Sequence, residues 1–250
     1  MSDEEPLEGG NASGSVVRIG GTVHKPWSDS TASVVAFVKA LRSAGVDAPA
    51  PRGRDEHGRQ VQEFVPGTLA LNADPFSQAD LHRVGGMVRA IHDASASYVP
   101  PEDAVWETAI PAPARDLVCH NDLAPWNLLI GDRWMFIDWD AAAPSTRVWD
   151  LAYSAQAFTL SDTSRSPRFA GNDLAAFVDG YGADDSVRRL LPDVMSERTA
   201  AMYNLLRTSL DTGKEPWASM FTAGHGDHWS SAENYVRTHR DTWLDALLPT

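Results

Sequence analysis

The segment H-N-D-L-A-P-W-N occupies residues 120–127, and the segment F-I-D-W-D follows it at residues 136–140. Asp122 lies two residues after His120, Asn127 follows five residues later, and a second aspartate, Asp138, lies eleven residues beyond that. Two carboxylates and an amide at these spacings can combine a proton acceptor with oxygen ligands for a hard cation such as Mg²⁺. These two segments carry the clearest indication of fold and chemistry in the chain.

The hydrophobic residues around both segments predict how they are held together. Residues 128–130 and 134–137, joined by a Gly131-Asp132 turn, predict a β-hairpin. The hairpin places Asn127 at the start of one strand and Asp138 at the end of its neighbour, so the two side chains can meet at one end of the ribbon. The alternative is that these polar residues only cap a loop, as Asp and Asn often do. Spacing, hairpin and second aspartate together favour a site.

Transfer of a phosphoryl group from a nucleotide needs this combination of groups. One carboxylate accepts the proton of the attacking hydroxyl, while an amide oxygen and another carboxylate hold Mg²⁺ against the phosphates. Protein kinases supply these groups with the motifs H-R-D-x-x-x-x-N and D-F-G. This chain keeps the first spacing, and of the second motif it keeps only the aspartate, Asp138.

At these motifs the chain resembles the aminoglycoside phosphotransferase and choline kinase-like family, which shares the protein-kinase fold. The matching segments are residues 120–127, residues 136–140 and V-W-D-L-A at residues 148–152. The resemblance implies that Asp122 is the catalytic base and that Asn127 and Asp138 are the Mg²⁺ ligands. It also implies that His120 supports the loop, and that Asp150 anchors the loop or caps a helix rather than contacting substrate.

The family resemblance implies a two-lobed α+β fold with a small antiparallel β lobe and a larger helical lobe. We expect residues 1–8 to be a disordered acidic tail, residues 9–66 to form the small nucleotide-binding lobe, and residues 67–250 to form the helical catalytic and substrate lobe. Apolar residues at helical spacing predict a helix over 78–96. Three further helical stripes are expected at residues 174–181, 202–210 and 235–243.

In the small lobe, residues 15–19 and 22–25 predict a hairpin around Gly20-Gly21, followed by a helix over 28–44 and a strand from residue 60 to 65. The glycine-rich segment 9–14 either covers the nucleotide phosphates or is a flexible linker.

The same resemblance suggests the residues that hold the nucleotide. Lys25 would contact the phosphates, and the backbone of Glu63 and Val65, beside the Pro66-Gly67 break, would face the adenine. A kinase lysine normally pairs with a glutamate on the next helix. The predicted helix over 28–44 contains no glutamate. Either the partner of Lys25 comes from elsewhere, or Lys25 acts unpaired, or the nucleotide is held differently.

Composition limits the class of protein and its partners. The chain has 250 residues, 43% hydrophobic and 22% charged, which is ordinary for a globular protein. Its net charge of −13 argues against nucleic acid as a partner. The single cysteine, Cys119, excludes an intramolecular disulfide and fits a buried filler better than a catalytic thiol. With no apolar run of membrane length and no signal peptide, we expect a cytoplasmic protein without a membrane partner.

The charge is concentrated around the motifs. Residues 101–150 contain nine acidic and three basic residues, a balance of −6. Such a segment either attracts Mg²⁺ and a cationic substrate or forms a solvated acidic surface. The motifs and the family resemblance imply a small-molecule kinase that uses ATP or GTP with Mg²⁺ and phosphorylates a hydroxyl of a small acceptor. The first interpretation of the charge favours a cationic, aminoglycoside-like or choline-like acceptor. The alternative is a non-catalytic nucleotide-binding pseudokinase or scaffold of the same fold.

Overall fold

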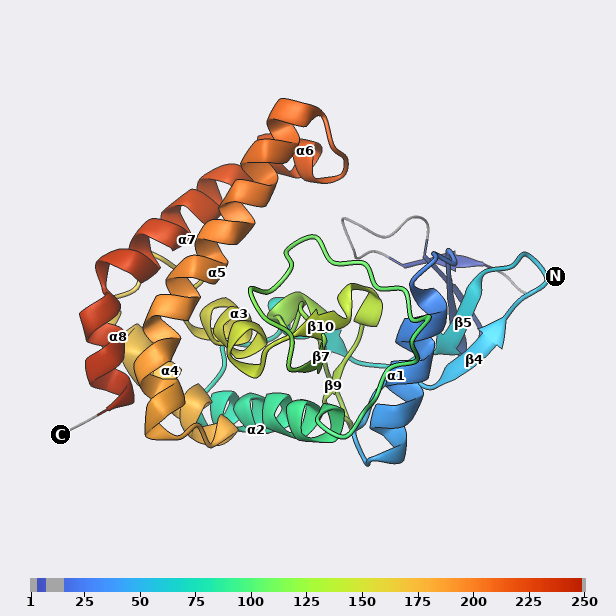
Figure 1. Cartoon of the computed structure of the whole chain (residues 1–250), viewed down its shortest axis with the longest axis horizontal. Coiled ribbons are helices and arrows are strands. Elements are labelled where there is room, and N and C mark those ends of the chain that lie inside the picture. The colour runs from blue at the N-terminus through green and yellow to red at the C-terminus, as the bar shows by residue number, and fades with distance from the viewer. Residues whose placement is uncertain (1–3, 8–15, 249–250) are drawn as a thin grey trace.

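The structure is a computed structural model that describes residues 4–7 and 16–248. Its N-terminal part is an antiparallel five-stranded sheet with the order β1-β2-β3-β5-β4. The strands are β1 (Glu5–Pro6), β2 (Val17–Ile19), β3 (Thr22–Lys25), β4 (Pro51–Arg54) and β5 (Gln60–Glu63). Helix α1 (Thr31–Ser43) lies beside this sheet, which forms one end of the molecule (Figure 1). The predicted small antiparallel lobe is therefore confirmed as a fold element.

The hairpin of β2 and β3 forms around Gly20-Gly21 as predicted, with Arg18 opposite Val23. Gly20 has a φ of +58°, a conformation that favours glycine in a tight turn. On its other side β3 pairs with β5, and Lys25 lies opposite Gln60 at the end of that ladder. The pairing fixes the position of Lys25 at the C-terminal end of a central strand.

The expected disorder of residues 1–8 is wrong for the described part of that tail. Glu5–Pro6 forms β1 and pairs with Val17 and Arg18, because the outer edge of β2 would otherwise leave its backbone groups unpaired. Ion pairs add to this contact: Arg18 lies 3.7 Å from Glu5, and Arg59 lies 2.9 Å from Glu4. Residues 1–3 and 8, and the glycine-rich segment 9–14, lie outside the described residues.

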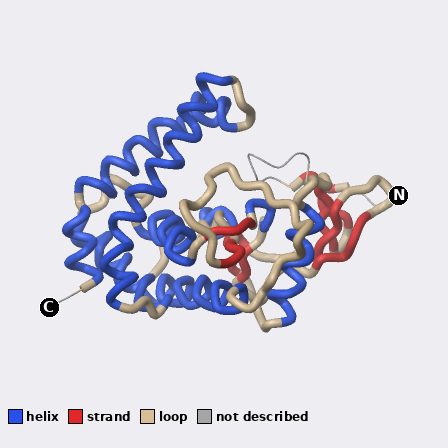
Figure 2. Tube along the Cα trace, viewed as in Figure 1, coloured by secondary structure: helices blue, strands red, loops and turns tan. Residues whose placement is uncertain are grey.

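Most of the remaining chain is helical (Figure 2). The helices are α2 (Gln78–Ser95), α3 (Arg147–Thr159), α4 (Pro167–Tyr181), α5 (Asp185–Thr212), α6 (Trp217–Met220), α7 (Gly226–Thr238) and α8 (Arg240–Leu247). Helices α5 and α7 run side by side as a hairpin that projects from the body, with α6 at its tip (Figure 1). Within residues 4–7 and 16–248, every helix is too short or too polar to cross a lipid bilayer.

The stripe predicted over residues 235–243 is interrupted. Helix α7 ends at Thr238 and α8 begins at Arg240, with His239 between them at φ −103° and ψ 22°. The Trp243 indole N–H donates to the carbonyl of Val236 at 2.9 Å, which satisfies one of the unpaired carbonyls at the end of α7. Apolar spacing continues across the break because the ends of both helices face the same core.

Five further strands link the predicted motifs. They are β6 (Thr68–Leu69), β7 (Leu117–Cys119), β8 (Leu128–Ile130), β9 (Met135–Phe136) and β10 (Ala143–Ser145). The predicted hairpin is confirmed, with Leu128 opposite Phe136 in the β8–β9 pair. Strand β10 pairs with β7, with Ala143 opposite Cys119. The segment after β7 and the segment before β10 therefore lie at the same end of one ribbon.

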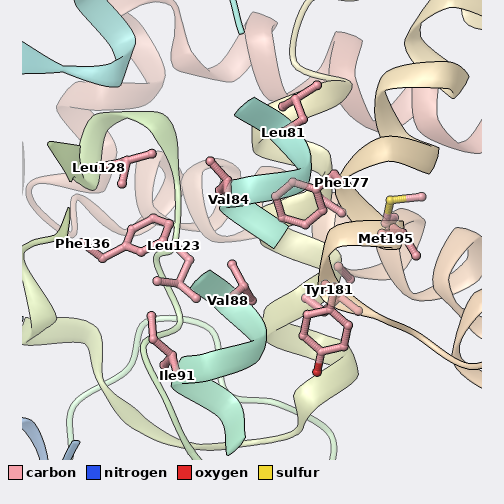
Figure 3. Close-up of a cluster of buried hydrophobic side chains, with 14 of the residues drawn as sticks. Leu81, Val84, Val88, Ile91, Leu123, Leu128, Phe136, Phe177, Tyr181 and Met195 are labelled. Carbon is pink, nitrogen blue, oxygen red and sulfur yellow. The ribbon is translucent and has the colours of Figure 1, made fainter. Parts of the chain in front are cut away.

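One hydrophobic core joins this region to the helices. Leu81, Val84, Val88 and Ile91 project from one face of α2 as the apolar spacing predicts. Figure 3 shows them between two other sets of buried side chains. On one side these are Leu123, Leu128 and Phe136, and on the other Phe177, Tyr181 and Met195.

The predicted boundary between the two lobes, at residues 66/67, stays a prediction.

Two glycines allow α2 and α4 to cross closely. A Cβ on Gly180 would lie 1.9 Å from the carbonyl oxygen of His82, and one on Gly85 would lie 2.0 Å from that of Phe177. We expect Gly180→Ala and Gly85→Ala each to lower the free energy of unfolding by about 3 kcal/mol, because backbone cannot yield as a flexible side chain can. Urea denaturation measures this loss.

The control is Gly86→Ala, one residue along the same helix. A Cβ there would lie 3.6 Å from the Gly180 oxygen, an ordinary contact. Alanine favours a helix over glycine by about 1 kcal/mol, so this variant should unfold at equal or higher urea concentration. Equal stabilities for the Gly86 and Gly180 variants would contradict the close crossing.

Candidate active site

Asp122 lies in the loop between β7 and β8, where three donors hold its carboxylate. Asn127 Nδ2 donates to Oδ2 at 2.8 Å, Tyr153 Oη donates to Oδ1 at 2.9 Å, and Trp126 Nε1 approaches Oδ2 at 3.4 Å. Burial raises the pKa of Asp122, and this outweighs the lowering by His120 and by the hydrogen bond from Tyr153. The arrangement fixes the direction of the carboxylate and makes it a stronger base than a solvated one.

Asn127 is buried at the start of β8, and its amide is oriented by Asp122. Its Nδ2 donates both to the Asp122 carboxylate and to the Asp122 main-chain oxygen, the latter at 3.0 Å. Because both amide hydrogens are engaged, Oδ1 is the atom left to accept a donor or bind a cation. The carbonyl of Asn127 accepts the N–H of Ile137 at 2.8 Å, so Asn127 lies next to the chain that leads into Asp138.

His120 connects these two segments from inside the protein. Its Nδ1 accepts the N–H of Asp122 at 3.2 Å, so in the neutral ring Nε2 carries the proton and donates to the carbonyl of Ile137 at 3.1 Å. A completely buried imidazole thus sets the distance between the residue that precedes Asp138 and the backbone of Asp122. This supports the role in loop structure that the resemblance implied.

Lys25 has acidic partners, which the sequence left open. Its Nζ lies 2.6 Å from Asp140 Oδ1 and 3.2 Å from Asp138 Oδ1, and its side chain is 5% exposed. Burial lowers the pKa of Lys25, but the charges of Asp138 and Asp140 outweigh this and raise it above its usual value. The lysine is therefore charged. Asp140, which sequence reasoning did not single out, belongs to the site.

Asp138 has an unusual backbone, with φ 57° and ψ 65°. This left-handed conformation costs a residue other than glycine about 1–3 kcal/mol, and it persists only where surrounding contacts require it. The only described residue besides Asp138 and the glycines with positive φ is Asn121, at φ 65°. Asn121 donates from Nδ2 to the carbonyls of Ala141 and Ala143. These hydrogen bonds join the loop after β7 to the segment after Asp138, so each of the two joined segments contains one residue with positive φ.

Asp150 anchors the loop, which is one of the two roles that the family resemblance implied for it. Its Oδ1 accepts the N–H of Asn121 at 2.8 Å, and its Oδ2 accepts from His92 Nε2 at 3.0 Å. His92 Nδ1 lies 2.9 Å from the hydroxyl of Tyr181. Nothing in the sequence indicated that His92 and Tyr181 would join the site, because they come from α2 and α4, far away in the chain. Cys119 is fully buried nearby, as the filler interpretation requires.

A buried cation, Arg198, lies next to the loop that carries Asp122. The Arg198 guanidinium lies 4.1 Å from the ring centre of Tyr153, and it approaches the carbonyl of Asn121 at 3.5 Å. Burial lowers the pKa of Arg198. The Tyr153 ring also stacks with Trp229, at 6.2 Å between ring centres. Both side chains pack near the ring whose hydroxyl donates to Asp122.

The side chains of Glu63 and Val65, the residues predicted to face an adenine, both make contacts within the protein. The Glu63 carboxylate accepts from Arg133 at 2.7 Å and from the N–H of Ala50 at 3.0 Å, so both of its oxygens are engaged by the protein itself. The Val65 side chain is buried against Leu129 and Met135. Its N–H makes no hydrogen bond within the described chain. The assignment of Glu63 and Val65 to nucleotide binding stays a prediction.

Comparison with known proteins agrees with this geometry. Residues 101–191 match the model of the phosphotransferase enzyme family. The chain is 30% identical over 198 residues to a trifolitoxin immunity protein of Rhizobium leguminosarum bv. trifolii, covering 73% of this chain and 75% of that protein.

Solved structures share the fold at low sequence identity. An amicoumacin kinase in complex with AMP-PNP, Ca²⁺ and Ami superposes with a TM-score of 0.70 at 14% identity, covering 95% of this chain and 88% of that one. A choline/ethanolamine kinase family protein from Mesorhizobium loti gives a TM-score of 0.64 at 17% identity, covering 99% and 92%. The predicted two-lobed protein-kinase-like fold is thereby confirmed.

The Asp150 anchor leads to a test of stability. Asp150→Ala would leave the Asn121 N–H and the His92 ring N–H buried without an acceptor. Each unsatisfied buried donor costs about 1–3 kcal/mol, so we expect the free energy of unfolding to fall by about 3 kcal/mol in urea denaturation. Asp132→Ala, in the exposed turn between β8 and β9, is the control and should change it by less than about 0.5 kcal/mol. Similar losses in both variants would contradict the anchoring role.

Proposed function

Because the chain belongs to the phosphotransferase enzyme family, we propose that it transfers the γ-phosphoryl group of ATP or GTP to a hydroxyl of a small molecule. The observation that carries this proposal is the Asp122 carboxylate, fixed by three donors, with the Asn127 amide bound to it and Asp138 held next to the same loop. Phosphoryl transfer depends mostly on positioning and charge stabilisation, and rigidly held polar groups supply both.

Asp122 is the proposed catalytic base. Its Oδ2 accepts from Asn127 and Trp126, whereas Oδ1 accepts only from Tyr153 among the described residues. A carboxylate oxygen can accept two hydrogen bonds, so Oδ1 keeps a lone pair for the hydroxyl of the acceptor. Burial raises the pKa of this carboxylate, which strengthens it as a base. Asp122 would orient the hydroxyl and accept its proton as the oxygen attacks phosphorus.

The residues that would hold Mg²⁺ are Asn127 and Asp138. Mg²⁺ prefers oxygen ligands. The Asn127 amide oxygen fits because both of its amide hydrogens already face Asp122. Asp138 fits because only its Oδ1 is engaged, by Lys25, among the described residues. When bound, the ion would neutralise charge on the nucleotide phosphates. Asn127 and Asp138 would thus hold the ion close to Asp122, the proposed proton acceptor.

Lys25, Glu63 and Val65 are the proposed nucleotide contacts. The charged Lys25 side chain lies beside Asp138 and Asp140, where it can reach a phosphate while it keeps one carboxylate. The N–H of Val65 has no acceptor among the described residues, so it offers a donor to the edge of a purine ring. Glu63 would contribute only its backbone, since its side chain is bound to Arg133 and Ala50.

The main argument for the alternative, a non-catalytic pseudokinase or scaffold, was a lysine without an acidic partner. A kinase-like chain with no glutamate on α1 suggested a lysine without a partner, and hence a degenerate site. Lys25 instead forms two ion pairs, with Asp138 and Asp140. We therefore propose an active kinase. Because its relative is a toxin immunity protein, hydroxyl-bearing antibiotics belong in the acceptor screen beside choline, amino alcohols and aminoglycosides.

The base is tested by substitution once the screen yields a phosphorylated acceptor. Asp122→Asn keeps the shape and one of the two acceptor oxygens, but it cannot take a proton. We expect kcat to fall by about 10²–10⁴-fold, with the affinity for MgADP changed by less than about threefold. Asp132→Asn serves as the control of equal charge change. Turnover of the Asp122 variant within a few-fold of the wild type would remove Asp122 from the role of base.

The charge of the acceptor is tested by salt. We propose that the acidic balance of residues 101–150 favours an acceptor with at least one amine. Lys25 neutralises part of this negative charge, and the buried Asp150 does not face a ligand. Attraction between exposed charges weakens beyond a distance of about 8 Å at 0.15 M salt. The KM for the acceptor should thus rise severalfold between 0.02 and about 0.5 M NaCl, with kcat nearly constant. A KM independent of salt would refute the cationic acceptor and leave the kinase proposal standing.

A further inference from the structure

The shortest contact of the buried lysine is not with the predicted metal ligand. Lys25 Nζ lies 2.6 Å from Asp140 and 3.2 Å from Asp138. A charge-assisted hydrogen bond near 2.7–2.9 Å is among the stronger interactions of a protein. With only 5% of its side chain exposed, Lys25 depends on these two carboxylates in place of solvent.

Helix α1 cannot supply the usual partner. Its sequence from Thr31 to Ser43 is T-A-S-V-V-A-F-V-K-A-L-R-S, which contains no acidic residue. The buried face of α1 carries hydroxyl and apolar side chains, among them Val34 and Phe37. In protein kinases a glutamate on this helix pairs with the strand lysine. Here both acidic partners of Lys25 come from the segment after β9.

Asp140 is held in place by the tryptophan between the two aspartates. Trp139 is 4% exposed, and its ring centre lies 4.5 Å from that of His120 and 5.9 Å from that of Phe37. Its indole N–H donates to the carbonyl of Phe136 at 3.1 Å. Helix α1 therefore contacts the segment that carries Asp140 through Phe37, and through that segment it can influence Lys25.

Charge explains why two carboxylates are present. Asp138 and Asp140 together carry −2 and Lys25 carries +1, so the cluster has a net charge of −1. If Asp138 is used as a metal ligand, Asp140 still neutralises Lys25 and keeps its ammonium group directed toward the phosphates. We infer that Asp140 is the positioning residue for Lys25, in the place of the missing helix glutamate, and this inference rests on the proposed function.

The test measures ADP affinity by isothermal titration calorimetry, with Mg²⁺ and with EDTA. A contact between Lys25 and the phosphates does not need the metal, so Asp140→Asn should weaken ADP binding about tenfold in both conditions. In a Lys25→Met background the same substitution should have almost no further effect, because the residue that it positions is gone. Asp140→Glu should recover most of the affinity, and Asp132→Asn should bind ADP like the wild type.

Asp138→Asn provides the contrast, because it should weaken ADP binding chiefly when Mg²⁺ is present. Thermal melts establish that each variant is folded. If the loss in Asp140→Asn disappears in EDTA and persists beside Lys25→Met, Asp140 is a metal ligand and the inference is wrong. Unchanged affinity in Asp140→Asn also overturns it while the proposed function stands. A wild-type protein that binds no ADP in either condition would refute the proposed function itself.

Discussion

The hydrogen bond from the Asn121 N–H to the buried carboxylate of Asp150 is the contact on which the rest of the site depends. It ties the turn after β7 to the first turn of α3, and His92 and Tyr181 complete the network from α2 and α4. Three helices of the large lobe thereby determine where one loop begins. Because the network is buried, any displacement of the loop would leave polar groups unsatisfied, and this keeps the strained backbone of Asn121 in place.

From that anchor the polar groups divide into an inner and an outer set. Inside, His120 spans from the Asp122 backbone to Ile137, and the Tyr153 ring packs against Arg198 and Trp229. In the outer set, each of the groups with proposed chemistry keeps an atom that no described residue engages. Asn127 keeps its amide oxygen, and Asp138 keeps one carboxylate oxygen. Rigid support under partly unsatisfied polar groups is the arrangement that catalysis by positioning requires.

The acidic character of the motif region has a different meaning in three dimensions than in the sequence. A balance of −6 over residues 101–150 suggests an acidic surface. In the structure Asp138 and Asp140 share Lys25, and Asp150 is enclosed by His92 and Asn121. Several of these acids therefore act within the protein. A sum over a segment cannot separate such groups from those that face a ligand, because their partners lie elsewhere in the chain, more than a hundred positions away in the case of Lys25.

The sequence by itself determined the local elements and the residues with proposed chemistry. Turn residues and apolar spacing act over a few residues, so the β8–β9 hairpin and the stripe of α2 followed from sequence alone, and the motif spacing pointed to Asp122, Asn127 and Asp138. Only the tertiary structure decided which distant groups meet them: Tyr153 at Asp122, His92 at Asp150, and Asp140 at Lys25. It also paired Glu5–Pro6 with β2 and split the last stripe at His239. Each of these depends on a contact across the fold, which propensity and spacing do not encode.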